Sequence, residues 1–294
     1  MNMGVLQYYF SMKALLWVLV VFVQTREYMG CLEEERVGLL HLKSFLIISI
    51  PSLRAYHLPS WVDHEKSDCC NWERVTCNST TGHLIELSLD NLMQDPRYTY
   101  SDYHSYYEME KYYEKRSWLL NVSLLEPFKE LRSLDLSFNA IDGCIPDEGF
   151  EKLSTLRNLE ILNLGYNSFD DNSILQSLGA ITSLKTLNLT ENKLEGCFPA
   201  QELFTLRNLI TLDISWNGYN GTLPNQGFER LVVLRNLETL ILDSNSFGYS
   251  IIPSLSNLTS LMTLSLSNNI FAFDDEGNIL VILIAFSHFN LYRF

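Results

Sequence analysis

One nine-residue frame recurs six times in this chain of 294 residues and restricts the folds available to it. The frame is Leu-x-x-Leu-x-Leu-x-x-Asn, with apolar substitutes at some leucine positions, and its first copy is LRSLDLSFN at 131–139. Successive copies lie 24 to 28 residues apart. A unit of this length cannot bury its apolar face alone, so neighbouring copies must stack into a solenoid. The closing asparagines of the six copies are Asn139, Asn167, Asn192, Asn217, Asn245 and Asn269.

The spacing inside the frame predicts a short strand followed by a turn. In LDL at 134–136, alternation directs both leucines inward and Asp135 outward. Leu131, Ile141 and Ile145 are expected to join the core. The amide of the closing asparagine can donate to and accept from backbone groups that the turn leaves unpaired, so stacked copies should form an asparagine ladder. The alternative of an unrelated β-sandwich is disfavoured, because six copies in register rarely arise by chance.

The half-repeat after the asparagine contains a Gly-x-apolar-Pro motif, as GCIP at 143–146, GCFP at 196–199 and GTLP at 221–224. Glycine permits a turn and proline blocks helix continuation. The motif resembles the plant-specific leucine-rich repeats of receptor-like kinases, receptor-like proteins and polygalacturonase-inhibiting proteins. This resemblance implies an α/β fold class: a right-handed leucine-rich repeat solenoid with a parallel concave sheet and a disulfide-bonded N-terminal cap.

Residues 31–83 are predicted to form the N-terminal cap. CLEEERVGLLHLKSFL begins with acidic residues and then spaces its leucines like a helix face. DCCNWERVTC follows, and its adjacent cysteines and Cys-Asn-Trp-x-x-Val-x-Cys order resemble the cap of plant extracellular leucine-rich repeat proteins. A cap of this kind covers the exposed core edge of the first repeat.

Four cap cysteines allow three disulfide pairings. The resemblance favours Cys31–Cys69 and Cys70–Cys77. The competing hypothesis is a zinc site made of the last three cysteines and His64. Adjacent cysteines suit a tetrahedral ion poorly, and an oxidising compartment favours disulfides. No metal site and no cofactor are therefore predicted.

Residues 1–30 are predicted to be a secretory signal peptide. Lys13 is followed by an apolar run at 14–23 that is too short to span a bilayer. Met12 is an alternative start, and cleavage is expected between Thr25 and Gly30. A buried apolar helix is the competing interpretation. The signal predicts the secretory pathway, with an extracellular or plasma-membrane location.

The rest of the chain divides into three parts. Residues 84–118 are interpreted as an irregular first repeat with a tyrosine-rich loop, for which a loop without a role is favoured over a ligand-contacting loop. Residues 119–270 hold the leucine-rich repeats. Residues 271–294 form a non-repeat tail, either a strand that covers the last repeat or, slightly favoured, a foreign tail that results from truncation. No segment of this chain is predicted to be a transmembrane helix.

Composition and motifs limit the possible functions. The net charge of −14 argues against nucleic acid or an anionic membrane as partner. The six histidines lie near no nucleophile elbow, metal motif or phosphate loop, so no catalytic residue and no enzyme activity are predicted. Asn-x-Ser/Thr sequons predict glycosylation. A glycan on the third of them would block part of the inner sheet face. The sequons lie at Asn78, Asn121, Asn188, Asn220 and Asn257.

Two further cysteines lie in the repeats. Cys144 and Cys197 occupy the same repeat position two repeats apart, which corresponds to about 10 Å at the spacing of stacked strands. This separation exceeds the reach of a disulfide, which is about 7 Å between Cα atoms. We expect free thiols that fill small apolar niches.

The outward positions of the strands define the predicted ligand-binding surface, on the concave face of the solenoid. Phe138, Tyr166 and Trp216 share one column, immediately before the asparagine, and exposed aromatic residues on a rigid sheet suit partner binding. Aromatic residues without a role at these positions are the favoured alternative. The predicted ligand-binding residues are Asp135, Phe138, Asn163, Tyr166, Glu191, Asp213, Trp216 and Asp243.

Cap, repeats and signal together resemble the N-terminal part of the ectodomain of plant receptor-like proteins, over about residues 12–270. The resemblance implies an extracellular module that binds a peptide, protein or microbial ligand in cell-surface signalling or defence. It also implies a receptor-like kinase as co-receptor in the full-length family. Two alternatives stay open: a secreted inhibitor of pectin-degrading enzymes, and a truncated product with little function.

Overall fold

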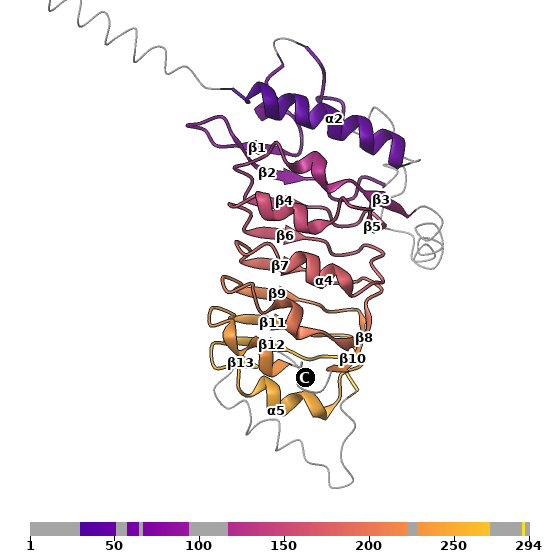
Figure 1. Ribbon diagram of the computed structural model, residues 1–294, viewed down its shortest axis with the longest axis vertical. Coiled ribbons are helices and arrows are strands. Elements are labelled where there is room, and N and C mark those ends of the chain that lie inside the picture. Colours follow the sequence, from indigo (N-terminus) through magenta and orange to yellow (C-terminus); the bar gives the residue numbers. More distant parts are fainter. Residues whose placement is uncertain are drawn as a thin grey trace, which may run out of the picture.

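The computed structural model describes residues 30–50, 58–64, 67–93, 117–222, 228–270 and 290–291. The predicted signal segment, the tyrosine-rich loop and most of the tail lie outside these residues. Figure 1 shows the described elements stacked along one axis in chain order, from the cap helix to the last repeats. The predicted leucine-rich repeat solenoid is confirmed.

One sheet of nine strands runs the length of the solenoid, in the order β1-β2-β4-β6-β7-β9-β11-β12-β13. β1 pairs antiparallel with β2, and every later pair is parallel. Equivalent repeat positions pair directly, as Leu134 does with Leu162. The bounds are β1 Val75–Cys77, β2 Leu84–Ser88, β4 Ser133–Asp135, β6 Ile161–Asn163, β7 Thr186–Asn188, β9 Thr211–Asp213, β11 Thr239–Ile241, β12 Thr263–Ser265 and β13 Asn290–Leu291.

The period-two pattern explains which side of this sheet is buried. The central leucine of each repeat strand points into the solenoid and is almost completely buried, while its two neighbours in the strand stay accessible. Leu131 and Ile141 are also buried, as expected. Ile145 is only half-buried, so its predicted core position is wrong. It directly follows the short strand β5, Ile141–Cys144.

Two small sheets and a series of short helical turns form the remaining sides of the solenoid (Figure 1). The turns that begin at residues 150 and 228 are 3₁₀ helices. The small-sheet strands are β3 Trp118–Leu120, β5 Ile141–Cys144, β8 Glu195–Phe198 and β10 Gly218–Thr222. The helical elements are η3 Val122–Leu125, η4 Phe150–Thr155, α4 Ser173–Leu178, η5 Ala200–Leu203, η6 Phe228–Val233, η7 Tyr249–Ile251 and α5 Ile252–Leu255.

The cap helix α2, Glu33–Ser49, lies across the first repeat and buries Leu39, Leu42 and Leu46 against it. Gly38 permits this close packing, because a Cβ at this position would lie 3.1 Å from the ring of Pro127. The buried Glu35 joins the helix to the sheet: its Oε2 accepts a hydrogen bond from the Leu84 backbone N–H at 2.9 Å. Burial raises the pKa of Glu35.

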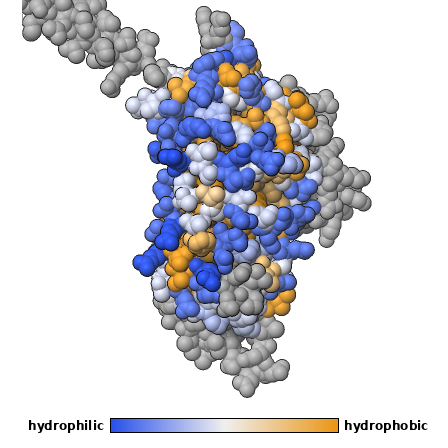
Figure 2. Space-filling model, in the orientation of Figure 1, coloured by the Kyte–Doolittle hydropathy of each residue, from blue (hydrophilic) through white to orange (hydrophobic). Residues whose placement is uncertain are grey.

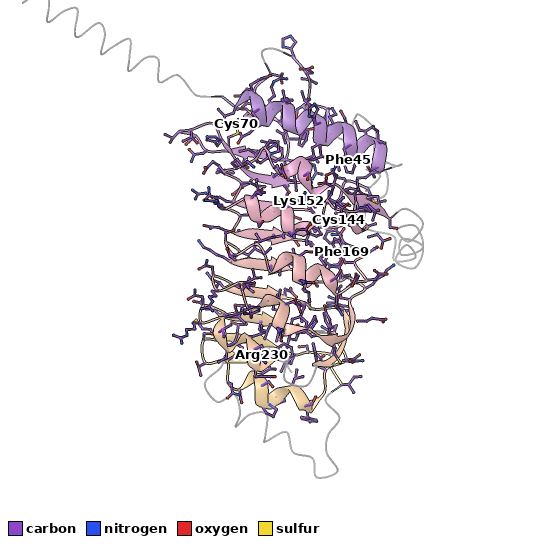
Figure 3. All side chains as sticks on the ribbon, viewed as in Figure 1. Phe45, Cys70, Cys144, Lys152, Phe169 and Arg230 are labelled. Atoms are coloured by element: carbon purple, nitrogen blue, oxygen red, sulfur yellow. A yellow bond between two sulfur atoms is a disulfide. The ribbon has the colours of Figure 1, made fainter. Side chains whose placement is uncertain are left out.

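The cap cysteines form the predicted disulfides, Cys31–Cys69 and Cys70–Cys77. The zinc hypothesis is therefore wrong, since its three cysteines are all bonded to sulfur. The second cysteine of the adjacent pair is labelled in Figure 3, beside the beginning of α2. The short helix η2, Cys69–Asn71, begins at this pair, and its cap Asp68 accepts from the Cys70 N–H.

The two repeat cysteines are free, as predicted. Cys144 is half-buried at the end of β5 (Figure 3), and burial raises the pKa of its thiol to about 12. Cys197 is exposed rather than placed in an apolar niche, so that part of the prediction is wrong. Its position in β8 directs the Cys197 side chain away from the core, whereas the next residue, Phe198, points into the core.

The predicted asparagine ladder is present in all six repeats. The side-chain Nδ2 of each asparagine donates to a backbone carbonyl of the preceding repeat and to one of its own. Its Oδ1 accepts a backbone N–H from the preceding repeat, such as that of Phe169 for Asn192. Each amide therefore bonds two successive turns together.

The last described strand, β13, pairs with β12 in the same parallel sense as the repeats. The sequence allows two interpretations of the tail, and it slightly favours a foreign tail over a strand that covers the last repeat. The two described residues of β13 extend the sheet, as a covering strand would. Within the described part of the chain, no helix has the length and apolar character needed to cross a membrane.

Candidate functional site

The outward side of β4, β6, β7, β9, β11 and β12 is the candidate site, and we call it the concave face. Its side chains fall into columns, because parallel strands in register place equivalent positions side by side. Three of the predicted residues share the column at the strand ends, Asp243 lies two positions further along its repeat, and four lie in the column before the ladder asparagine. Figure 2 shows a largely hydrophilic surface with scattered hydrophobic patches in the view it presents.

Backbone geometry sets the direction of the column before the asparagine. Phe138, Tyr166, Glu191 and Trp216 all have positive φ, between 49° and 59°. This left-handed conformation is uncommon for residues other than glycine and asparagine. It turns the chain sharply out of the strand, so that the asparagine enters the core and the residue before it points to solvent. The sequence pattern alone did not indicate this conformation.

The aromatic members of that column are exposed to different degrees and have different neighbours. Phe138, Tyr166 and Trp216 are 37%, 41% and 54% exposed. The first two rings stack on each other, with centroids 4.0 Å apart. Trp216 lies two repeats further on, with Glu191 between, and its indole makes no ring contact or hydrogen bond with any residue that the structure describes.

The next column lies at the end of each strand and is built from short polar side chains. Oδ1 of Asp135 accepts the backbone N–H of Ser137 at 2.9 Å, and Asp213 does the same for Ser215. Asn163 and Asn188 use their amide oxygens in the same way, for the N–H two residues later. These side chains satisfy the backbone where the strand ends.

A single cross-strand bond distinguishes the two aspartates of this column. Nδ2 of Asn163 donates to Oδ2 of Asp135 at 3.0 Å, so both oxygens of that carboxylate have donors. The residue opposite Asp213 on the following strand is Ile241, which cannot donate. Burial raises the pKa of Asp213, the hydrogen bonds from Ser215 oppose this shift, and the charge of Asp243 adds to it.

Asp243 belongs to the column of Ser137 and Ser215 rather than to that of Asp213. Both serines are buried, although alternation continued from Asp135 and Asp213 would direct them outward. Their hydroxyls donate to the preceding aspartates, so each side chain folds back on the strand end. The carboxylate of Asp243 instead reaches the next repeat, where it accepts from Ser265 and Ser267.

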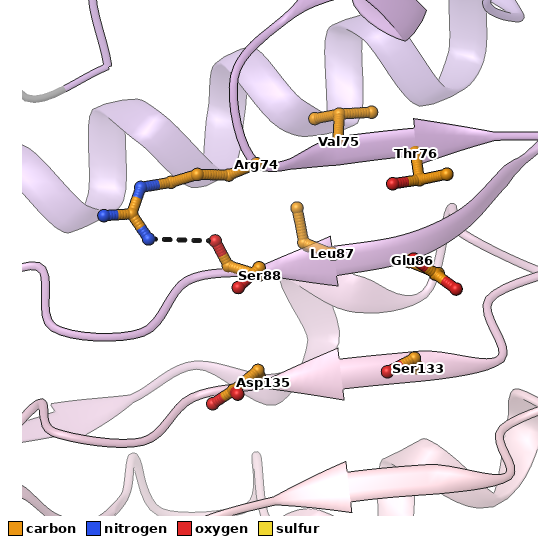
Figure 4. A pocket seen from close by; sticks show the side chains of 8 residues that line it. All are labelled: Arg74, Val75, Thr76, Glu86, Leu87, Ser88, Ser133 and Asp135. Atoms are coloured by element: carbon orange, nitrogen blue, oxygen red, sulfur yellow. Dashed lines mark hydrogen bonds between the residues drawn. The ribbon is translucent and has the colours of Figure 1, made fainter.

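A polar pocket of about 290 Å³ lies at the N-terminal end of the concave face. Figure 4 shows its walls, formed by β1, β2 and β4. The polar side chains that line the pocket include Glu86, Ser88 and Asp135. Arg74 lies at one end of the pocket and donates to the Ser88 carbonyl at 3.2 Å. Of the pocket residues, only Asp135 was in the predicted set. The alternation of LIELS at 84–88 could have indicated Glu86 and Ser88.

The predicted glycosylation asparagines occupy different environments. Asn220 and Asn257 are exposed, whereas Asn78 and Asn121 are half-buried and accept backbone N–H groups of their own turns. Asn188 lies on the concave face, between Asn163 and Asp213. Among the described residues, no group of three or more His, Cys, Asp or Glu side chains is arranged to hold a metal ion.

Two protein families match parts of the sequence. The leucine rich repeat N-terminal domain matches residues 32–78, which include the cap helix and three of the four cap cysteines. The leucine rich repeat matches residues 130–153 and 236–258. Both matches agree with the described fold.

Curated relatives include receptor-like proteins of Arabidopsis thaliana. The chain is 42% identical to receptor-like protein 14 over 174 residues, which is 58% of this chain and 16% of that protein. It is 38% identical to receptor-like protein 13 over 264 residues, 87% of this chain and 23% of that protein. The chain thus spans less than a quarter of the length of these relatives.

A solved structure with the same fold is the ectodomain of the Arabidopsis receptor kinase HAESA, in complex with an N-terminally extended IDA peptide hormone. It superposes with a TM-score of 0.56 at 26% identity, over 82% of this chain and 38% of that one.

Proposed function

The chain is a leucine-rich repeat protein with the cap and repeats of plant receptor-like proteins, and we propose that its concave face binds an extracellular peptide or protein ligand. Binding would serve cell-surface signalling or defence rather than catalysis. The observation that carries the proposal is the column of exposed aromatic residues on a mainly polar sheet. The comparison with a peptide-bound ectodomain of the same fold supports it.

Rigidity is what makes this face suitable for recognition. The ladder asparagines and the strand-end aspartates hold each turn by several hydrogen bonds, so exposed side chains are presented in fixed positions. Because this surface is already ordered, binding of a partner costs little conformational entropy on this side of the interface. Aromatic side chains supply contact area with few rotatable bonds.

The cap stabilises the end of the sheet on which this surface begins. Its disulfides, its helix and the Glu35 contact to β2 fix the first strand relative to the repeats. Disulfides of this kind suit an oxidising environment, which supports the secretory route and an extracellular or plasma-membrane location as proposals. A receptor-like kinase is proposed as co-receptor in the full-length family.

The proposal is tested by selecting a random peptide library on the chain produced in an oxidising compartment that adds no N-linked glycans, because a glycan on Asn188 would cover part of the concave face. Thr211 is half-buried at the centre of the concave face, while Thr259 is exposed before β12 on the repeat edge. We expect Thr211→Trp to abolish retention of the selected peptides and Thr259→Trp to leave it unchanged. Equal retention by both variants would place binding elsewhere and contradict the proposal.

A further inference from the structure

Building on the proposed ligand-binding role of the concave face, we propose that the ligand presents an arginine or lysine side chain to Asp213 and Asp243, beside the indole of Trp216. This assigns a chemical class to the segment of the partner that lies over the repeats of β9 and β11. The partner is a peptide or protein segment, because the surface combines charge with an exposed aromatic ring.

The three residues come together from two consecutive repeats. Asp213 ends β9, and Trp216 begins the turn that follows it. The backbone N–H of Trp216 donates to the backbone carbonyl of Asp243 at 2.8 Å, which fixes the backbone of Asp243 beside the turn that carries the indole. The carboxylate of Asp243 is held by Ser265 and Ser267 of the next repeat. Backbone pairing therefore holds the group in place.

Asp213 has unused capacity to accept a hydrogen bond. Its Oδ1 accepts from the N–H and hydroxyl of Ser215, at 2.9 and 2.6 Å. Its Oδ2 has no donor among the described residues, in contrast to Oδ2 of Asp135, which Asn163 satisfies. A half-buried carboxylate oxygen without a donor is costly and favours a ligand that supplies one.

The two carboxylates also lack a neutralising charge within the described residues. Neither aspartate forms an ion pair there, and Lys185, which precedes β7, is already paired with Glu160 at 2.9 Å. A cation from the partner would relieve the repulsion between the two carboxylates. The chain's net charge of −14 would draw such a partner in.

Trp216 provides a second contact for the cationic side chain of the ligand. Of the exposed aromatic residues in its column it is the most accessible, and no described ring covers it. A guanidinium or ammonium group over an indole face is attracted by the ring electrons, and the attraction strengthens when the pair is partly desolvated. The apolar Ile241 beside Asp213 offers a surface for the alkyl stem of the same side chain.

The test uses the peptides retained by the library selection, each resynthesised with its arginine replaced by citrulline or its lysine by acetyl-lysine. Each replacement removes the charge and keeps most of the shape. Affinities are measured for the wild-type chain, for Asp213→Asn/Asp243→Ser, and for the control Asp170→Asn, which removes an exposed carboxylate outside the predicted binding set. Asparagine already occupies the position of Asp213 at 163 and 188, and serine occupies that of Asp243 at 137, 215 and 267, so the variants should fold, and thermal melts check this.

We expect neutral replacement to weaken binding to the wild-type chain at least tenfold at low salt. The double variant should lose this preference, and the control should keep it. If retained peptides depend on Thr211 but bind equally well with neutral replacements, the cationic inference is wrong and the proposed function stands. If no retained peptide loses binding in the Thr211→Trp variant, both the cationic inference and the proposed function are wrong.

Discussion

The rings of Phe138 and Tyr166 lie face to face, with centroids 4.0 Å apart and planes inclined by 9°, although the two residues belong to different repeats. Both residues have positive φ, so the stack depends on the same turn geometry being reproduced in consecutive repeats. The stack therefore depends on the register between the two repeats, and it also fixes the positions of two aromatic side chains of the candidate site.

A double-mutant cycle tests this contact. Phe138→Ala and Tyr166→Ala should show a coupling of about 0.5–1.5 kcal/mol in the free energy of unfolding, because stacked aromatic pairs contribute that much beyond their buried area. Phe138→Ala with Trp216→Ala is the control, and should be additive within about 0.3–0.5 kcal/mol because those rings are far apart. Urea unfolding measures both. Additive effects for the adjacent pair would contradict the stack.

The ladder gives a second prediction. Asn192→Ala removes an amide that donates to the Leu164 and Leu189 carbonyls and accepts from the Phe169 N–H. Leaving these groups unpaired should cost about 1–3 kcal/mol of unfolding free energy. Thr186→Ala on the concave face should cost less than about 0.5 kcal/mol. Similar losses in thermal melts would show that the ladder contributes nothing.

How far the sequence predicted these features depends on the residue. The frame spacing predicted the ladder asparagines, because their role follows from one repeated position. It did not predict the positive φ of Phe138 or the buried Ser137, since these depend on how the turn folds back on Asp135. Alternation alone places Ser137 outward.

A second ladder also went unpredicted. At the beginning of each strand segment, Asn208 donates to the Thr182 carbonyl and Asn236 to the Arg207 carbonyl, each in the preceding repeat. Serine replaces asparagine in other copies, and Ser183 donates to the Leu159 carbonyl. Because the residue type varies, the repeated role becomes visible only once the strands are stacked.

The two cap disulfides should differ in their contribution to stability. Cys31–Cys69 spans 38 residues and Cys70–Cys77 spans 7. Restriction of the unfolded chain then predicts losses of about 4 and about 2 kcal/mol when each pair is replaced by serine. Denaturant unfolding of the two double variants measures this, with Cys144→Ser as the free-thiol control. The reverse order would contradict the loop-length explanation.

The raised pKa of Asp213 predicts that a substitution at this position changes the free energy of unfolding in a pH-dependent way. Because its folded pKa is raised, its contribution to stability is fully present below the unfolded pKa of about 3.9 and is lost as pH rises through the folded pKa. At neutral pH, Asp213→Asn should therefore raise the urea midpoint, and the gain should disappear at about pH 3. Asp135→Asn, whose carboxylate accepts from Asn163, should show no such gain. A pH-independent effect at position 213 would refute the prediction.

The most direct test of ligand binding on the concave face is site-specific photo-crosslinking to a library-selected peptide. Benzoylphenylalanine replaces Trp216 in one variant and Phe204 in another; these residues are 54% and 46% exposed, but Phe204 follows η5, away from the concave sheet. The account predicts a peptide adduct at position 216 and none at 204. An adduct at 204 with none at 216 would contradict it.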